Sequence, residues 1–534
     1  MAATVARVCR RKIQPFIVWL PDDGRCAASK GRARRRTGRP YGLSLGAGCE
    51  GVSRAPRCPP LGTARPAPAA GRYPLEVPDT TAEHLGQGLK VRHLTMMGLG
   101  SAIGAGLFLG TGSGIRTAGP AILVSYAIAG VLVVLVMRML AEMAAALPSS
   151  GSFSTYAEQG IGRWAGFTLG WVYWFTLIMV LGAEITGASA IVHSWLPAVP
   201  QWLVALVLVA GFAAVNLVGV RSFGEFEFWF AAVKVVVIVV FLAVGTLLIF
   251  GWLPGTGPVG LAHLVGDGGF APNGWGEVAA GLLVVVFAFG GIEIVTIAAA
   301  ESADPQRSIA AAARSVVWRI LLFYVGSVAI MVLVLPWSSG ALLTGPFVAV
   351  LEVAKVPGLA VAMEVVVVIA LLSAFNANLY GTSRMAFSLA GRGDGPRGLL
   401  RVSGQGVPVA AVLVSVAFAL ISVLLNAVLP EQLLGILLNA AGASLVVIWI
   451  VIAISHLRLH RRLEAEGRLT VRMWGFPYLS WLTVGLLLAL VALMLANDAA
   501  RAQILATAGL VLVVVSIYVV RERLRARAAV KVRR

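Results

Sequence analysis

Apolar residues fill most of the chain from about residue 92 onward, in stretches of some 20 positions or more that short polar segments separate. A helix of about 20 residues crosses the roughly 30 Å hydrocarbon core of a bilayer, because each residue adds about 1.5 Å. The pattern therefore predicts an all-α, polytopic membrane protein with twelve transmembrane helices. The expected spans are 93–115, 119–146, 160–193, 200–220, 226–251, 277–301, 313–336, 347–390, 407–428, 433–457, 474–496 and 502–521.

Two of these spans are interrupted in the same unusual way. The first contains MGLGSAIGAGLFLGTGSG (97–114), and each glycine destabilises a helix by about 1 kcal/mol relative to alanine. The sixth contains FAFGGIEIVTIAAAES (287–302), in which two glycines precede Glu293. Interrupted helices at corresponding positions of two halves are the best sequence sign of a secondary transporter built from inverted repeats, here of five helices each.

The first interruption offers main-chain groups to a ligand. An unwound segment inside a membrane exposes peptide N–H and C=O groups that lipid cannot satisfy, so it faces protein or a water-filled cavity. The N–H groups that open the following half-helix suit a carboxylate. The alternative is close helix packing, because Gly100–Gly104 and Gly106–Gly110 both have the GxxxG spacing. The candidate substrate contacts in this segment are Ser101, Ala102, Ile103, Gly104, Ala105 and Gly106.

The second interruption carries a carboxylate. Glu293 falls near the middle of its span, where an ionisable group is functional by default because its burial is costly. It is placed to accept a substrate ammonium, to hold a helix end or to take up a proton; a purely structural tie to unwound backbone is the alternative. Phe289, Gly290 and Gly291 are candidate substrate contacts with it, although Phe289 suits core packing equally well.

Two further charged residues within predicted spans are candidates for proton coupling. Lys234 lies in EFEFWFAAVKVVVIVVF (225–241), where it either extends back to the membrane surface or points inward as a proton carrier. Glu184 lies in LGAEITGA on the third span. On the eighth span, Asn376 and Asn378 are candidate cavity-lining residues, although such amides more often bond neighbouring helices.

The net charge of +19 suggests nucleic-acid binding at first sight, but its distribution indicates membrane topology instead. Residues 1–90 hold 16 Lys or Arg against 6 Asp or Glu, and the other basic residues favour one alternating set of loops. Because cytoplasmic loops retain positive charge, we expect both termini in the cytoplasm. The expected inner loops carry Arg138, Arg163, Arg221, Arg307, Arg314, Arg319, Arg384, Arg392, Arg397, Arg401, Arg458, Arg461, Arg462, Arg468 and Arg472, and the outer loops carry Arg116, Lys355 and Arg501.

The two ends of the chain differ from the membrane part. Residues 1–87 are rich in Arg, Pro, Gly and Ala, so we expect a disordered, basic cytoplasmic tail; a misassigned start explains them equally well. Residues 526–534 are expected to form a basic cytoplasmic C-terminal tail. All four cysteines lie in the first tail, which leaves the membrane part without a thiol for catalysis or metal binding.

The sequence indicates neither an enzyme nor a cofactor. It contains no HExxH, Ser–His–Asp, Walker or CxxC pattern, which argues against a protease, an ATP-driven pump and a redox enzyme. His456 and His460 share a helix face and have a spacing that suits a metal. Many arginines surround them at a helix end, so we expect both histidines to face water and expect no metal site.

Several ordered motifs resemble one known family. They are RHLTMMGLGSAIGAGLFLGTGSGIRTAGPA, LAEMAAALPSSGSFSTYAE, EFEFWFAAVKV, FAFGGIEIVTIAAAES and SAFNANLYGTSRM. Residues 88–525 are thereby identified as a member of the amino-acid permease family of the amino acid–polyamine–organocation superfamily. EIVTIAAAES, VVWRI, AGRGDGP and VRMWGFPYLSW are most similar to 4-aminobutyrate permeases, while FGGIE also resembles proline and aromatic amino-acid permeases.

The resemblance implies a fold and an activity. The fold is an inverted five-plus-five-helix core with two extra helices (LeuT-like, or APC), and the activity is proton-coupled amino-acid uptake by alternating access. Both helix breaks would hold the substrate's charged ends; Lys234 matches a lysine that replaces sodium in proton-coupled members, and Glu184 matches a span-three carboxylate. We expect symport of 4-aminobutyrate or a related neutral amino acid such as proline, with amino acid/amine exchange as the alternative.

The expected partners follow from this activity. They are a small amino acid, a proton and the lipid bilayer of the plasma (inner) membrane, with no nucleic acid. The sequence leaves open whether the protein is a monomer or an oligomer.

Overall fold

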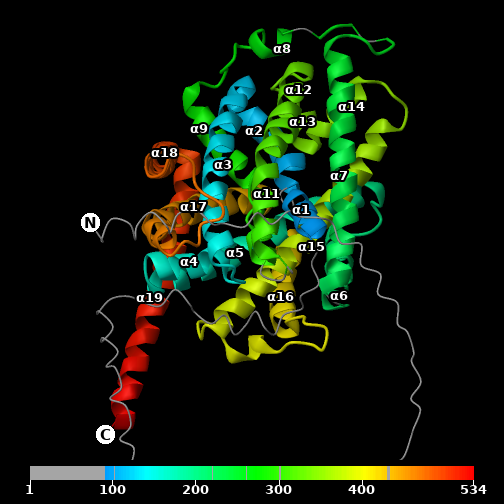
Figure 1. Cartoon of the computed structure of the whole chain (residues 1–534). Coiled ribbons are helices and arrows are strands. Elements are labelled where there is room, and N and C mark those ends of the chain that lie inside the picture. The colour runs from blue at the N-terminus through cyan, green and yellow to red at the C-terminus, as the bar shows by residue number, and fades with distance from the viewer. Residues whose placement is uncertain are drawn as a thin grey trace, which may run out of the picture. The chain divides into compact units, whose positions relative to one another are not determined.

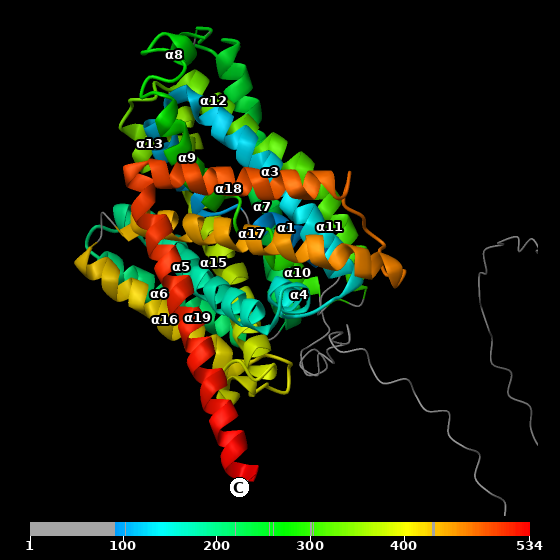
Figure 2. The same ribbon diagram turned by 90° about the vertical axis from the view of Figure 1, so that its left-hand side faces the viewer.

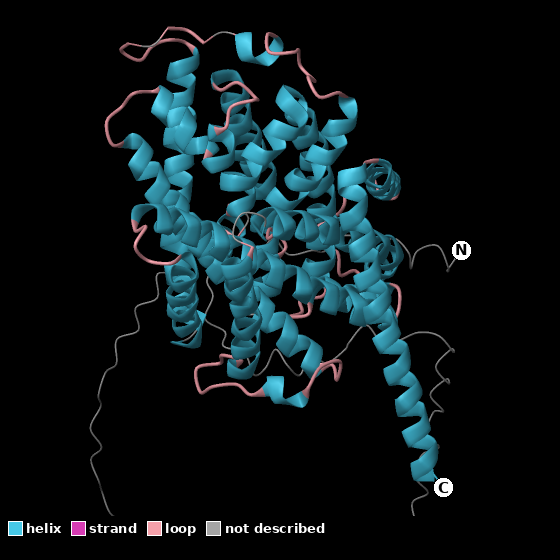
Figure 3. Cartoon of the chain, turned by 180° about the vertical axis from the view of Figure 1, so that it is seen from behind, coloured by secondary structure: helices cyan, strands magenta, loops and turns pink. Residues whose placement is uncertain are grey.

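The computed structural model describes residues 91–533, apart from 102, 219, 256, 260, 300, 301, 303 and 430–432. In that part of the chain all regular structure is helical, and Figure 3 shows only helices and loops. Helices suit lipid because they satisfy their own peptide groups. The first half contains α1 (Val91–Gly100), η3 (Gly106–Gly110), α2 (Thr111–Ala118), η4 (Gly119–Ala121), α3 (Ile122–Ala146), α4 (Ser152–Gly160), α5 (Arg163–Trp195), α6 (Gln201–Val218), α7 (Val220–Ile249), α8 (Ala262–Val265), α9 (Trp275–Ala288) and α10 (Ile294–Ala298).

The second half continues the helical pattern. It contains α11 (Pro305–Arg319), η6 (Ile320–Val325), α12 (Gly326–Val334), α13 (Ala341–Thr344), α14 (Pro346–Val353), α15 (Leu359–Gly391), η7 (Arg397–Leu400), α16 (Val409–Val428), α17 (Leu433–Ala465), α18 (Tyr478–Ala496) and α19 (Asp498–Arg533). Among the described residues, nine helices are long and apolar enough to cross a membrane. Three of the twelve predicted spans have a different form, because α1–α2 and α9–α10 are broken and η6 interrupts α11–α12.

One predicted span is wrong as a single helix. The stretch 347–390 forms two helices, α14 and α15, which a short turn separates. Pro357 supplies no N–H for a continuous helix, and Gly358 adopts a left-handed φ of 76° immediately before α15. The expected C-terminal tail is helical as far as Arg533, as part of α19. The predicted tail 1–87 lies outside the described residues.

The interior is built around α5. About two thirds of its apolar window, 67%, is buried by other parts of the protein, against 17% for α19. Helix α5 packs against α15, α17 and α4, and Figure 1 shows α5 and α15 in the middle of the bundle. Figure 2 shows α17 and α18 side by side, with α19 crossing them at a steep angle. Helix α1 packs against α7, α11 and α15, so its broken end lies in the interior.

Candidate functional site

Both predicted interruptions are present, and they adjoin one another. The first break follows α1 at Gly100, and the second separates α9 from α10. The Ser101 hydroxyl donates a hydrogen bond of 2.8 Å to the carbonyl oxygen of Gly291. This bond joins the two breaks across 190 residues of sequence. The site therefore arises where two broken helices meet.

The first break is closed by a carboxylate from α5. The Ala105 N–H, at the start of the π-helical turn η3, donates to both oxygens of Glu184, at 3.1 and 3.0 Å. A carboxylate suits this position because the N-terminal end of a helix is electropositive. Gly104 makes the approach feasible, since a Cβ there would overlap the Glu184 carboxylate and lie 2.8 Å from the Cβ of Ala374. Ile103 is buried beside it, and Ala102 lies outside the described residues.

The second break satisfies its own backbone. Gly291 has a φ of 94°, a conformation that glycine adopts without strain, and its N–H donates to Glu293 at 3.1 Å. Glu293 is 3% exposed and lies close to the Tyr173 hydroxyl of α5. Gly290 allows α17 to approach, because a Cβ there would lie 2.5 Å from Leu445. Glu293 thus binds the unwound backbone of its own break, which is the structural role that the sequence analysis gave as the alternative to substrate or proton binding.

Phe289 lies in an aromatic cluster at the second break. Its ring is fully buried, 4.8 Å from the ring of Tyr324 and 5.9 Å from that of Tyr126. The Tyr126 hydroxyl in turn hydrogen-bonds Thr111 of α2 at 2.8 Å. The cluster therefore packs α3, η6 and the end of α9 together and covers the break on this side.

Close helix packing accompanies the breaks. A Cβ at Gly106 would lie 2.5 Å from the Cα of Ala288, so η3 and the end of α9 touch backbone to backbone. The glycines of the GxxxG pattern therefore do allow close helix packing. This packing occurs together with the helix break and does not replace it.

Lys234 points inward. Its side chain is 0% exposed, which excludes the alternative that it extends along the protein surface. It lies close enough to Glu184 and to Glu227 for electrostatic attraction to both carboxylates. Two carboxylates thus face one ammonium, and the fully ionised trio carries one net negative charge. Burying net charge is costly, so binding one proton is the simplest way to neutralise this cluster.

Glu227 is the residue that the sequence reasoning missed. It is fully buried on α7, and the Ser373 hydroxyl of α15 donates to its Oε1 at 2.9 Å. A signal for it was available in EFEFWFAAVK, because Glu227 and Lys234 are seven residues apart and share a helix face.

The two candidate asparagines have different positions. Asn376 lies next to Glu227, and its Oδ1 accepts a 2.7 Å hydrogen bond from Asn216 of α6. Asn378 is buried too, but its amide donates to the Ala374 carbonyl of its own helix at 2.7 Å. Asn376 therefore lies beside the cluster of Glu184, Lys234 and Glu227, whereas the amide of Asn378 makes a hydrogen bond within α15.

A cavity of about 490 Å³ borders the first break. Phe108 and Gly187 line it, as do Ser194 and Glu364, from segments that the charge pattern places on the outer side. Phe108 follows directly after the break, and its ring lies 4.8 Å from that of Phe347. Ligand cavities of about 300–1,000 Å³ are typical of small-molecule sites, so this volume suits an amino acid.

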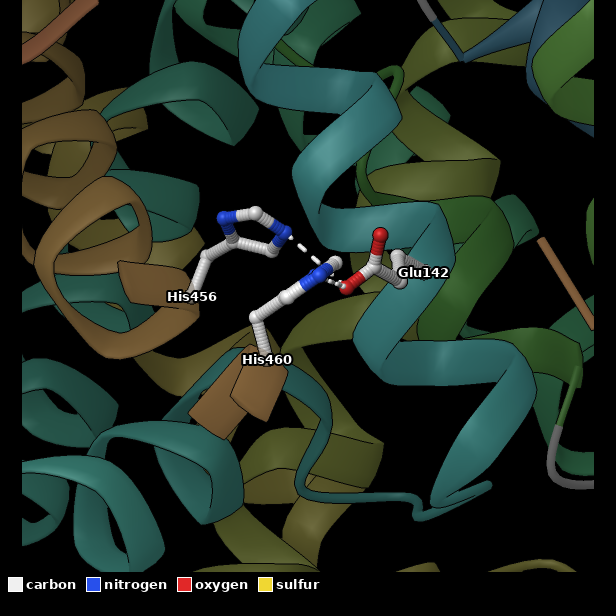
Figure 4. Close-up of side chains that lie close together, drawn as sticks. All are labelled: Glu142, His456 and His460. Carbon is white, nitrogen blue, oxygen red and sulfur yellow. Dashed lines mark hydrogen bonds and ion pairs between the residues drawn. The ribbon is translucent and has the colours of Figure 1, made fainter. Parts of the chain in front are cut away.

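His456 and His460 do not face water, which corrects the sequence prediction. Both are buried on α17 and point at Glu142 of α3, as Figure 4 shows. The Glu142 Oε1 lies 3.1 Å from His456 Nε2 and 2.5 Å from His460 Nδ1, and its Oε2 accepts the N–H of Met473. The burial arises because the segment before α18 covers this end of α17, with Phe476 stacked on His460.

This cluster has the composition of a metal site, but its spacing suits hydrogen bonds better. Two ligands of a tetrahedral zinc ion lie roughly 3.3–3.6 Å apart, given metal–ligand distances of about 2.0–2.2 Å. The 2.5 Å separation of Glu142 and His460 is a hydrogen-bond distance. The three side chains therefore tie α3 to α17 and to the segment before α18.

Comparison with known proteins agrees with the geometry. Residues 93–531 match the amino acid permease family. The chain is 57% identical over 431 residues to the aromatic amino acid transport protein AroP of Corynebacterium glutamicum, covering 80% of this chain and 93% of that one. It is 46% identical over 438 residues to the gamma-aminobutyric acid permease of Bacillus subtilis, covering 82% and 93%. Over 425 residues it is 42% identical to the Escherichia coli gamma-aminobutyric acid permease, covering 79% and 91%.

A solved structure shares the fold. The backbone resembles the crystal structure of a manganese transporter mutant from Eremococcus coleocola, with a TM-score of 0.51 and 16% identity over 80% of this chain and 94% of that one. At this identity the likeness concerns the fold alone. The family match and the relatives together show an amino acid transporter of the cell membrane with many membrane-spanning helices, and no enzyme. The chain belongs to the amino acid permease family.

Proposed function

We propose that the protein is a proton-coupled symporter that carries a zwitterionic amino acid into the cell by alternating access. The observation that carries this proposal is the meeting of two broken helices beside a buried cluster of two carboxylates and one ammonium. The breaks supply main-chain groups for the substrate's charged ends, and the cluster supplies a place for one proton.

The substrate's carboxylate is proposed to bind at the first break and its ammonium at the second. The Ala105 N–H already holds Glu184, so a substrate carboxylate would bring a second anion to the same helix end. Two neighbouring anions repel one another, and a proton on the Glu184–Lys234 cluster relieves that repulsion. Glu293 presents a carboxylate oxygen to the substrate ammonium. Substrate and proton therefore favour each other's binding, which is the requirement for symport.

Coupling is proposed to act through Lys234. While charged, the lysine attracts Glu184 and thereby ties α7 to α5 and to the first break. Loss of its proton toward the cytoplasm removes this attraction and lets the bundle tilt inward. A proton entering across about 100 mV releases about 2.3 kcal/mol, which supports an accumulation of roughly fiftyfold.

For the substrate, the relatives indicate two classes. The relative with 57% identity is named as an aromatic amino acid transporter, whereas those at 46% and 42% are named as gamma-aminobutyric acid permeases. The higher identity favours an aromatic amino acid. The sequence motifs favoured 4-aminobutyrate, which is the second candidate, ahead of proline.

The architecture completes the proposal. Among the described residues nine helices are long and apolar enough to cross a membrane, and the two breaks fall in the first and sixth of the twelve predicted spans. We infer two inverted five-helix repeats followed by two extra helices. The arginine-rich loops place both termini in the cytoplasm.

Uptake in proteoliposomes tests the proposal. The full chain is assayed with labelled phenylalanine, tyrosine, tryptophan, 4-aminobutyrate and proline at pH 5.5 and 7.5, with and without an uncoupler. We expect accumulation of an aromatic amino acid that is faster at pH 5.5 and collapses with the uncoupler. Transport that is indifferent to the uncoupler but requires an amino acid or amine on the opposite side would establish an exchanger instead.

The Lys234→Ala variant tests the coupling residue. We expect it to lose proton-driven accumulation and to retain counterflow, the exchange of labelled for unlabelled substrate without a pH gradient. Full accumulation by this variant would remove Lys234 from the mechanism.

A further inference from the structure

Glu227 and Lys234 form a pair along one face of α7. Seven residues make two helical turns, so the two side chains project from the same face about 10 Å apart along the axis. Side chains on a helix lean toward its N-terminus, which brings the long lysine side chain back toward Glu227. The two groups attract each other electrostatically, and both are 0% exposed.

One oxygen of the Glu227 carboxyl accepts a hydrogen bond, and the other oxygen accepts none from the described residues. Its Oε1 accepts the Ser373 hydroxyl at 2.9 Å, while its Oε2 has no hydrogen-bond partner among the described residues. The Asn376 Nδ2 beside it, also buried, has no hydrogen bond within 3.5 Å among the described residues, and as a donor it complements the ionised form of this oxygen. Complete burial disfavours the carboxylate while the neighbouring amide and hydroxyl donors favour it, so Glu227 is suited both to take up a proton and to release it.

Glu227 lies between Lys234 and the predicted cytoplasmic end of α7, so a proton on Glu227 is closer to the cytoplasm than one on Lys234. The charged cluster begins at the Ala105 N–H of the first break and continues through Glu184 and Lys234 to Glu227. Glu227 is two turns closer than Lys234 to the start of α7, the end that adjoins Arg221 and the predicted cytoplasmic side. Beyond it, Asn376 and then Asn216 of α6 continue the chain of buried polar groups.

We propose that Glu227 is a second intramembrane proton-binding site, which receives the proton from Lys234 and releases it toward the cytoplasm. The inference rests on the proposed function, because it requires that transport be proton-coupled. In the step, the flexible lysine side chain brings its ammonium against Glu227 and gives its proton to the carboxylate, and the pair becomes a neutral amine and a neutral carboxylic acid. The acid then releases the proton to water at the cytoplasmic end as Lys234 takes up the next proton, so that Glu227 is again a carboxylate and the trio never carries more than one net negative charge.

The charged groups facing Glu227 support this transfer. They are Lys234 on its own helix and, beyond the lysine, Glu184 of α5; the neighbouring groups from α15 and α6 are the neutral Ser373, Asn376 and Asn216. Neutralising the pair leaves Glu184 without its attracting ammonium. The attraction between Glu184 of α5 and Lys234 of α7 is therefore lost at the moment when the proton reaches Glu227.

The test compares two transport modes of the Glu227→Gln variant in proteoliposomes. Glutamine keeps the shape and still accepts the Ser373 hydroxyl, but it does not take up the proton. We expect accumulation driven by a pH gradient to fall at least tenfold, together with substrate-dependent proton influx measured by a trapped pH-sensitive dye. Counterflow of the same labelled amino acid should stay within about twofold of wild type, because it needs no proton release.

Two further variants make the result decisive. Glu227→Asp keeps a titratable group and should recover at least a third of wild-type accumulation. Glu466→Gln removes an exposed carboxylate that makes only surface ion pairs, and should leave both modes unchanged. Wild-type accumulation by Glu227→Gln would overturn the inference. So would an equal loss of both modes in Glu227→Gln and Glu227→Asp, which would indicate a packing role.

Failure of the proposed function has a different signature. In that case the wild-type protein itself shows no accumulation driven by a pH gradient, while counterflow continues. Such a result would overturn proton coupling, and with it the role of Glu227.

Discussion

The two helix breaks solve the same physical problem in different ways. Each frees peptide N–H groups in the protein interior, and each binds one of them to a carboxylate. At the second break the carboxylate is Glu293, two residues from the Gly291 N–H that it binds. At the first break it is Glu184, which lies on α5 and is 79 residues away from Ala105. The second break therefore binds a carboxylate from its own segment, whereas the first break binds one from a neighbouring helix.

We propose that this difference gives the breaks different tasks. The hydrogen bond between the Gly291 N–H and Glu293 does not depend on the relative positions of α5 and α9. The second break is therefore suited to binding the substrate in every state of the transport cycle. The bond from Glu184 links the first break to Lys234, and through it to α7. A change of charge on that cluster reaches the first break directly. We infer that the first break responds to the proton and that the second binds substrate in every state.

The sharpest test of this comparison is Glu184→Gln. The amide oxygen still accepts the Ala105 N–H, but the charge that attracts Lys234 is gone. We expect accumulation to fall from up to roughly fiftyfold at about 100 mV to none, while the purified protein keeps its melting temperature within a few degrees. Proteoliposome uptake and thermal unfolding of the same preparation measure both. Retained accumulation would mean that the first break is not linked to the proton.

A second test acts on the packing of the first break. In Gly104→Ala the added methyl group overlaps the Glu184 carboxylate and meets Ala374, and overpacking typically costs about 1–3 kcal/mol. We therefore expect initial uptake rates to fall about tenfold or more. Gly485→Ala on α18 is the matched control, since nothing lies within 4 Å of a Cβ there. Equal rates for the two variants would show that the close approach at Gly104 is unnecessary.

A third test acts on the second break. Glu293→Gln removes the charge that is proposed to bind the substrate ammonium, and a hydrogen bond to a charged group contributes about 1.5–3 kcal/mol. We expect the KM of uptake to rise about tenfold or more, with the number of protons carried per substrate unchanged. Initial rates over a range of substrate concentrations, with proton influx recorded in parallel, measure both. A changed proton ratio would erase the distinction between the two breaks.

The sequence predicted the breaks because their cause is local. Clustered glycines and the Gly290–Gly291 pair weaken a helix wherever the chain places them, and Gly291 is free to adopt its positive φ of 94° without strain. Glu293 was equally visible, since a carboxylate inside an apolar span stands out. The turn that divides 347–390 was missed, although its cause, Pro357 followed by Gly358, is local too.

The partners of the charged groups were less accessible. The sequence left Lys234 with two orientations, and only the packing of α7 against α15 and α1 shows that it points inward. His456 and His460 were expected to face water, because no local pattern shows that Met473 and Phe476 return to cover them. Glu227 was overlooked although its spacing from Lys234 was visible in the sequence; only the packing of α7 shows that it is buried beside Ser373 and Asn376 of α15.

By itself, the sequence determined that the chain is a bundle of apolar helices, where two of them break and which ionisable residues lie within them. These properties follow from residue types and their spacing, which act over a few turns of helix. The tertiary structure decided which carboxylate binds which break, that Lys234 faces Glu184 and Glu227, and that the histidines are buried. The pairs Ala105–Glu184 and Glu142–His460 join residues 79 and 318 positions apart in the chain, so they depend on how the helices pack rather than on local pattern.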